Sequence, residues 1–312
     1  MKFEFTLKGR DWLGLYLIGL AIYGGQFAVN RLLLPAGGAR PGPVDASNAG
    51  IAFLVSVITI VAGIFLYVPV FRKFLAHTRL NGVAFRYTGS SPEFVLMYIG
   101  NGILSVLTLG IFAPWAIRNV LRHVAKHVEY ERDGFGFEGK ALDLLEMSIG
   151  ALVLPIILIC IGLALLGKGI GALSAWGLPM VLCFYLVLVP FVYFSLKWMV
   201  NFRFGKARIR LDAEAIPSIL KILQELFLSI VTLGIYAPAA HARLFKYFAD
   251  RTKVSKDDGS IWSVKTTLDT LQAWKLTWTV ILLTIVTAGV YGAWAYCRTI
   301  SLYADSTRLE RS

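Results

Sequence analysis

Long apolar stretches alternate with short polar connections along the chain, and this pattern predicts helices. The apolar stretches lie at 12–34, 51–71, 94–116, 146–167, 177–197, 217–239 and 274–297. A helix of about 20 residues crosses the roughly 30 Å apolar core of a bilayer, so each stretch is long enough by residue count. The pattern is therefore typical of a mainly α-helical membrane protein.

Short segments with alternating apolar and polar residues lie between these stretches. They are Phe3–Phe5, Phe85–Tyr87, Phe135–Phe137, Ile209–Leu211 and Ile261–Val264. Asn-Gly or Asp-Gly pairs stand beside three of them, and such pairs commonly connect β-strands. We expect short β-segments that pair into a small cytoplasmic sheet; amphipathic segments at the membrane interface are the alternative.

An eight-residue motif occurs three times, as TLGIFAPW at Thr108–Trp115, TLGIYAPA at Thr232–Ala239 and, more loosely, TAGVYGAW at Thr287–Trp294. Each copy follows about 15 apolar residues and precedes a helix with Arg or Lys, which indicates internal repeats. Glycine permits a tight bend and proline cannot continue the hydrogen bonds of the preceding turn, so each motif is expected to break a helix. The residues expected at the breaks are Thr108, Gly110, Pro114, Trp115, Thr232, Gly234, Pro238, Thr287, Gly289 and Trp294.

The apolar residues before each break form about 21 Å of helix, which is too short to cross the apolar core. We therefore expect shallow re-entrant helical hairpins over 94–128, 217–252 and 273–307, each entering and leaving the membrane on the same side. The alternative is a proline-kinked helix that crosses completely.

Composition and charge favour both a membrane location and the shallow hairpins. Hydrophobic residues make up 57% of the chain and charged residues 16%, whereas soluble proteins carry about 25% charged residues. With seven full spans, 16 of the 31 Lys and Arg residues would lie outside the membrane and 15 on its cytoplasmic side. With shallow hairpins, only Arg31, Arg40 and Lys168 lie outside. Because positive residues concentrate on the cytoplasmic side, the second topology is preferred, with both termini in the cytoplasm.

Together, these elements predict one integral-membrane domain of five units, each with a strand and a helical hairpin. The units are 1–80, 81–132, 133–206, 207–257 and 258–312. The first and third units are expected to contain full-span hairpins, and the other three are expected to contain shallow ones.

The first copy of the motif has a characteristic context, because Asn101 lies seven residues before it and Phe135–Gly139 follows the next helix. These residues, with the Pro-Trp pair of the motif, resemble the YjgN-like family of uncharacterised bacterial multi-pass inner-membrane proteins. The resemblance covers nearly the whole chain, although Glu225 and Val280 replace the asparagine in the other copies. It implies an inner-membrane location and points to a membrane metallopeptidase as a partner, but it implies no activity.

Basic residues follow each motif on helices that also carry aromatic and aliphatic residues. The candidates are Arg118, Arg122, Arg243, Lys246 and Arg298. Such helices typically lie at the membrane interface, with their cations at anionic headgroups. We therefore expect them to bind anionic lipid or a membrane partner. Nucleic acid is not expected, because the interleaved aromatic residues suit lipid better.

Two polar residues, Asn101 and Glu225, lie within apolar stretches at the same position of the repeat. An ionisable group inside a membrane is costly and indicates function by default, although Lys221 is spaced to pair with Glu225 on a helix. A structural role within the hairpins is the favoured interpretation. The alternative is a transporter or channel whose path lies at the broken helices.

No catalytic, cofactor or metal site is expected from the sequence. His123 and His127 share one helical face, but the zinc-protease pattern H-E-x-x-H requires glutamate where Val124 stands, and Lys126 adds positive charge. A solvated basic face is the favoured interpretation. The sequence therefore favours a non-enzymatic membrane protein that organises anionic lipid or a membrane partner through its basic helices.

Overall fold

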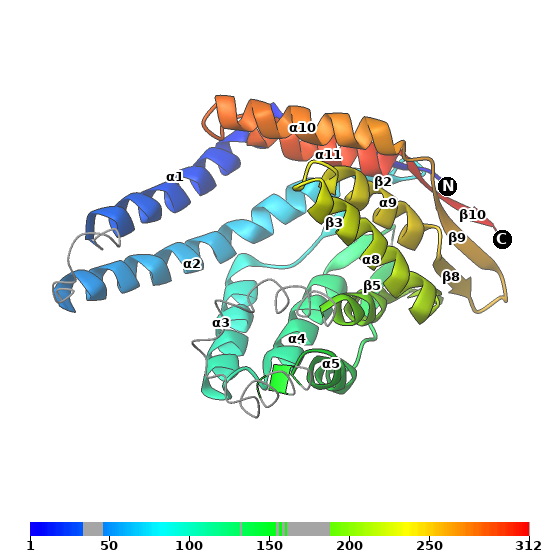
Figure 1. Cartoon of the computed structure of the whole chain (residues 1–312), viewed down its shortest axis with the longest axis horizontal. Helices are drawn as coiled ribbons and strands as arrows, with labels where there is room; N and C mark the ends of the chain where they lie inside the picture. Colours follow the sequence, from blue (N-terminus) through cyan, green and yellow to red (C-terminus); the bar gives the residue numbers. More distant parts are fainter. Residues whose placement is uncertain (34–45, 132, 154–155, 158–159, 161–187, 312) are drawn as a thin grey trace.

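Strands and pairs of helices alternate in the computed structural model, which describes residues 1–33, 46–131, 133–153, 156–157, 160 and 188–311 (Figure 1). The strands are β1 (Phe3–Phe5), β2 (Thr78–Leu80), β3 (Val83–Tyr87), β4 (Val128–Tyr130), β5 (Asp133–Phe137), β6 (Asn201–Phe204), β7 (Ala207–Leu211), β8 (Thr252–Lys256), β9 (Ile261–Thr266) and β10 (Thr307–Arg311). The helices are α1 (Gly9–Leu33), α2 (Ala46–Ala76), α3 (Ser91–Leu107), α4 (Ala113–Lys126), α5 (Ala141–Ser148) with a π-helical turn at Ile149–Val153, α8 (Ala215–Val231), α9 (Ala237–Ala249), α10 (Thr270–Val286) and α11 (Gly292–Asp305). A further helical segment is described at Leu188–Met199.

The ten described strands form one antiparallel sheet in which chain order and spatial order coincide, from β1 to β10. Each helical pair connects two strands that also pair with one another, as where Phe3 lies opposite Leu80. The last strand returns to the first. Lys2 forms a bridge with Arg308, and the backbones of residues 1 and 309 exchange two hydrogen bonds of 2.8 Å. The sheet is therefore almost closed, like a barrel.

This architecture corrects the predicted fold class, a mainly α-helical membrane protein with full-span and shallow hairpins. The sheet has ten strands, and within the described residues only α1 and residues 47–76 of α2 are long and apolar enough to cross a membrane. The even-numbered strands carried no distinct signal because each closely follows a helix, with no cluster of turn residues between them to mark where the strand begins. About half of each of the predicted stretches 146–167 and 177–197 lies outside the described residues.

Alternation along the strands gives the sheet two different faces. The five segments with predicted alternation lie in β1, β3, β5, β7 and β9. Phe5, Tyr87 and Phe137 are buried on one face, where each packs against helices. Charged neighbours such as Glu4 and Arg86 are exposed on the other face. The helical pairs therefore extend from an apolar face, and a charged face is left to solvent.

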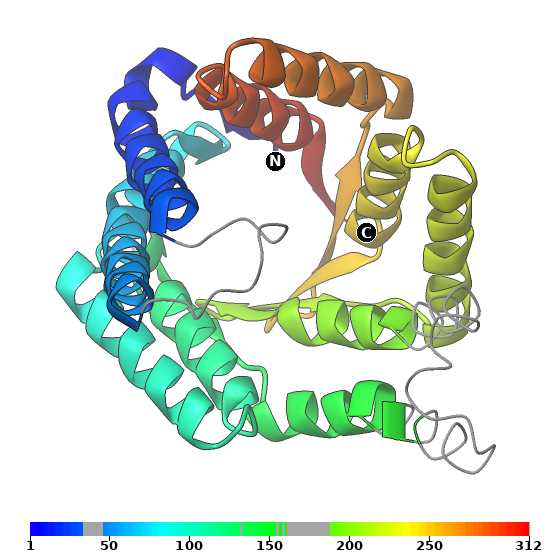
Figure 2. The same ribbon diagram turned by 60° about the vertical axis from the view of Figure 1, so that its left-hand side comes forward.

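The helical pairs follow one another around a ring, with the first pair beside the last (Figure 2). At this contact of α1 with α11, which we call the seam, Trp12 is buried and its ring centre lies 4.9 Å from that of Phe74. The indole Nε1 of Trp12 donates to the carbonyl of Ala293 at 3.0 Å. Residues 281 positions apart in sequence therefore close the ring.

Candidate functional site

The three copies of the motif form the same turn between two helices. In each copy a threonine hydroxyl donates to the carbonyl four residues earlier at 2.8 Å and accepts the N–H of the aromatic residue four residues later. The next two residues have positive φ, 51° at Leu109 and 88° at Gly110 in the first copy. A left-handed backbone is unfavourable for leucine, so the threonine bonds and the glycine together hold this conformation. The three turns lie at Thr108–Gly110, Thr232–Gly234 and Thr287–Gly289.

Proline begins the second helix rather than ending the first. Pro114 and Pro238 lie in the first turn of α4 and α9, where a missing N–H removes no helical hydrogen bond. The third copy forms the same turn with an alanine at this position. The tryptophans stack on the motif aromatics, with 6.1 Å between the ring centres of Trp115 and Phe112 and of Trp294 and Tyr291.

The turns expose large apolar side chains. Leu109 is 95% exposed, Leu233 is 93% exposed, and Val286 beside the third turn is 81% exposed. Each is flanked by further exposed aliphatic residues. Single exposed apolar residues are ordinary on a soluble protein, but a contiguous patch of them marks an interaction surface.

This exposed apolar surface continues along the helices. Leu96 in α3 and Ile216 in α8 are exposed, and so are Phe27 in α1 and Phe53 in α2. Among the described helices, α1 and α2 are also the ones whose length and composition allow a membrane crossing. Long and short helical pairs therefore share one kind of surface.

Two of the predicted lipid-binding residues lie over the tyrosines of their own turns. The guanidinium of Arg243 is 5.5 Å from the ring centre of Tyr236, and that of Arg298 is 5.7 Å from Tyr291. Both arginines are exposed, as is Lys246. Each arginine stands seven residues beyond its tyrosine, which is about 10 Å of helix. The repeat therefore places a cation at a fixed distance from two apolar turns.

The first copy is arranged differently. Asn119 stands where Arg243 stands in the second copy, and the half-buried Arg118 donates to the Asn119 side chain at 3.3 Å. Arg122 is exposed and lines a cavity of about 510 Å³ together with residues of β5, β6 and β7. The five predicted basic residues therefore lie on α4, α9 and α11 and do not form one patch.

Asn101 and Glu225 each make contacts within their own hairpin. The side-chain amide of Asn119 in α4 donates to Asn101 Oδ1 in α3 at 2.9 Å. Glu225 is fully buried; its carboxylate lies 2.7 Å from Lys221 Nζ and accepts a 2.7 Å hydrogen bond from the Tyr236 hydroxyl. Within the described part of the chain, no hydrogen bond or ion pair joins Asn101 to Glu225. Each side chain therefore connects the first helix of its own pair to a residue beyond the turn.

Two cavities flank α11 at the seam. One, of about 760 Å³, lies against α1 and α2 and has apolar walls that include Tyr16 and Phe74. The other, of about 1070 Å³, is lined by polar groups as well, including Lys8, Arg10 and Arg298. The predicted lipid-binding residue Arg298 thus lines the same cavity as two cations from the other end of the chain.

The acidic residues of the larger cavity already accept hydrogen bonds. Asp269 caps the N-terminus of α10, and Asp305 accepts from a backbone N–H of β1 and a serine hydroxyl of α11. Arg10 pairs with Asp11 at 3.7 Å, but both side chains are exposed, and such pairs contribute little. The cavity therefore contains three cationic side chains and two carboxylates that are already hydrogen-bonded within the protein.

Some residues of the candidate sites come together only through the fold. Lys8 and Arg10 belong to no motif in the sequence, yet they share a cavity with Arg298. Glu93 lies beside His123 and His127 although it is 30 positions before the first of them. A single sequence carries no local signal for either contact, because each depends on which helices become neighbours.

The two long apolar helices indicate a protein that associates with a membrane. A family model described as bacterial protein of unknown function, DUF898, matches residues 1–265, and the chain therefore belongs to this family. The YjgN-like resemblance of its motifs agrees with this membership. No curated protein and no solved structure matches the chain.

Proposed function

We propose that this protein is a non-enzymatic membrane protein that organises anionic lipid through its helical pairs. The observation that carries the proposal is the exposure of Leu109 and Leu233 at turns with left-handed backbone. Transfer of one leucine side chain from water to an apolar phase gains about 2 kcal/mol. Three such turns, with their flanking aliphatic residues, are more stable in the acyl region of one leaflet than in water.

The positions of Arg243 and Arg298 support a lipid with an anionic headgroup. They stand about 10 Å of helix from the turn tyrosines, and interfacial helices bury their apolar faces by about 5 to 10 Å. The backbone positions of these arginines therefore lie at the headgroup layer when the turns enter the acyl region, with the guanidinium groups over the turn tyrosines. Each cation near an anionic leaflet contributes about 1 kcal/mol.

The seam adds a specific site to this surface. Its apolar cavity beside Tyr16 and Phe74 suits an acyl chain, and the cavity on the other side of α11 holds Lys8, Arg10 and Arg298. Ligand sites are commonly apolar clefts with a few polar groups that fix orientation. An anionic phospholipid combines both chemistries.

In the proposed topology α1 and α2 cross a bacterial inner membrane, and the shorter pairs enter it from the cytoplasmic side. The strand–helix–helix–strand units are internal repeats, both termini are cytoplasmic, and the charged face of the sheet is in water. The recurrence of the same turn supports this arrangement. The exposed apolar surface also leaves room for a membrane-protein partner, such as the metallopeptidase implied by the family resemblance.

Neutralising the cations beside the turns should reduce the preference for anionic lipid. We expect the triple variant Arg243→Gln, Lys246→Gln, Arg298→Gln to lose most of the preference for spin-labelled phosphatidylglycerol over phosphatidylcholine, measured by electron paramagnetic resonance in reconstituted vesicles. Each cation contributes about 1 kcal/mol, which is about fivefold in affinity. Added salt should reduce the wild-type preference in the same way.

A matched control replaces three arginines that are exposed on the sheet, Arg79, Arg208 and Arg308, by glutamine. This control should keep the wild-type preference. An unchanged preference in the triple variant, or an equal loss in the control, would contradict the proposal. Substrate or ion flux that is abolished by Asn101→Ala alone would favour transport instead.

A further inference from the structure

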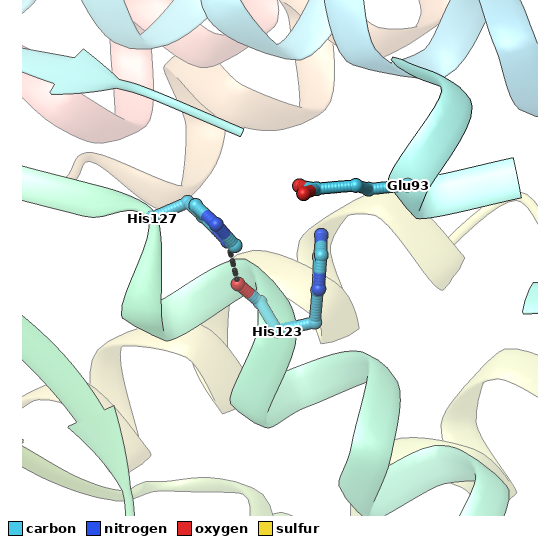
Figure 3. A group of neighbouring side chains, drawn as sticks. All are labelled: Glu93, His123 and His127. Carbon is cyan, nitrogen blue, oxygen red and sulfur yellow. Dashed lines mark hydrogen bonds between the residues drawn. The ribbon is translucent and has the colours of Figure 1, made fainter. Parts of the chain in front are cut away.

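Three metal-binding side chains meet at the base of the second helical pair (Figure 3). His123 and His127 lie one helical turn apart at the C-terminal end of α4, and Glu93 lies in the first turn of α3. One nitrogen of each imidazole and one carboxylate oxygen lie within 4.8 Å of one another. Figure 3 shows the His123 ring and the Glu93 carboxylate pointing toward each other from the two helices.

The orientation of His127 is already fixed as in many metal sites. Its Nδ1 lies 2.8 Å from the carbonyl oxygen of His123. An N–H at Nδ1 that donates to this carbonyl leaves the lone pair of Nε2 free for a metal. Histidine ligands of metals almost always make such a hydrogen bond with their other nitrogen, because it sets the tautomer and the ring direction.

Two buried polar atoms at this place lack partners. Neither His123 Nε2 nor the Tyr87 hydroxyl has a hydrogen-bond partner in the described residues, and Tyr87 lies beside His127 with 6.1 Å between ring centres. Buried polar atoms are nearly always bonded, so unpaired ones call for an explanation.

We propose that Glu93, His123 and His127 bind a divalent transition-metal ion of the Zn²⁺ type. Two imidazoles and one carboxylate form a common ligand set for zinc, with bonds of about 2.0 to 2.2 Å and ligand atoms therefore about 3.4 Å apart. Closing the site requires movements of about 1 Å, and the exposed Glu93 side chain is free to make them. The fourth position remains open to water or a small anion. The ion joins the start of α3 to the end of α4.

The metal itself is the probe that tests this site. The full chain, purified in detergent and freed of metal with a chelator, should bind one Zn²⁺ per chain in competition with a chromophoric chelator. Co²⁺ at the same site should give the visible absorption of a four-coordinate nitrogen and oxygen environment. We expect Glu93→Gln to weaken Zn²⁺ binding by at least about tenfold, and His123→Gln with His127→Gln to abolish it.

His77 provides a matched control. Its Nδ1 makes the same 2.8 Å contact with a backbone carbonyl four residues earlier, but that residue is Lys73 rather than a second histidine. The His77→Gln variant should bind Zn²⁺ as the wild type does. Undiminished binding by the double histidine variant would overturn the proposal, and so would a wild-type chain with no Co²⁺ spectrum. The Co²⁺ spectrum needs no variant, and lipid preference is measured separately, so either proposal can fail while the other stands.

Discussion

Replacing Glu225 by alanine should lower the free energy of unfolding by about 3 to 5 kcal/mol. The fully buried carboxylate pairs with Lys221 Nζ at 2.7 Å and accepts from the Tyr236 hydroxyl at 2.7 Å. Alanine leaves the ammonium and the hydroxyl without their partner in a poorly solvated place. Denaturation in detergent micelles, followed by circular dichroism, measures the change.

Two variants calibrate this result. Glu225→Gln keeps an oxygen for the Tyr236 hydroxyl but removes the charge, so its loss should lie between those of wild type and Glu225→Ala. Glu214→Ala removes an exposed carboxylate at the start of the same helix, and it should change stability by about 0.5 kcal/mol or less. Equal effects of Glu225→Ala and Glu214→Ala would show that the buried pair does not stabilise the hairpin.

Trp12→Ala should have a comparable effect, because Trp12 closes the ring of helical pairs. Removal of a buried tryptophan costs about 3 to 5 kcal/mol, and this variant also loses the hydrogen bond to the Ala293 carbonyl. Cys297 is buried in the same core. The variant should therefore show faster reaction of Cys297 with a thiol reagent, measured by mass spectrometry, as well as lower stability.

Leu32→Ala is the control for the seam, since Leu32 lies on the same helix but is 84% exposed. It should leave the rate of Cys297 modification unchanged. If Cys297 of the Trp12→Ala variant reacts with the thiol reagent as slowly as in the wild type, closure of the ring does not depend on this contact.

The strands show how far local sequence signals reach. Segments such as Phe135–Phe137 could be identified because aromatic residues alternate with small or charged ones beside a turn. The partner strand Val128–Tyr130 follows α4 almost directly and has three residues, so it carries no period of its own. The bridge between Lys2 and Arg308 depends on the positions of all the intervening units. The size and closure of the sheet could therefore not be predicted from the sequence.

The helix breaks were predictable in place but not in cause. The motif placed interruptions at Gly110 and Gly234, and both residues lie in the turns with positive φ. The prediction assigned the break to glycine and proline together. The glycines do adopt the turn conformation, but the prolines begin the next helix, and the threonine hydroxyl, as in Thr108, bonds both helices. A threonine that bonds backbone groups on both sides has no distinct sequence signature in an apolar stretch.

The candidate sites divide in the same way. Arg243 and Arg298 could be chosen from the sequence because they recur at one position after the motif. The cavity at the seam could not, because Lys8 and Arg10 belong to the first unit and Arg298 to the last. Glu93 joins the histidine pair from a different helix. The H-x-x-x-H pattern by itself therefore does not reveal the third side chain of the proposed metal site.

Insertion of the turns into lipid is tested most directly by fluorescence quenching at single cysteines. An environment-sensitive fluorophore is attached at position 109, 233 or 288 in reconstituted vesicles, and at Lys140, which is exposed beside the sheet, as the aqueous reference. Lipids with a nitroxide on the acyl chain should quench the three turn positions strongly and Lys140 weakly, because the turns lie in the acyl region. Equal quenching at all four positions by aqueous iodide, with none by the acyl-chain nitroxide, would contradict membrane insertion.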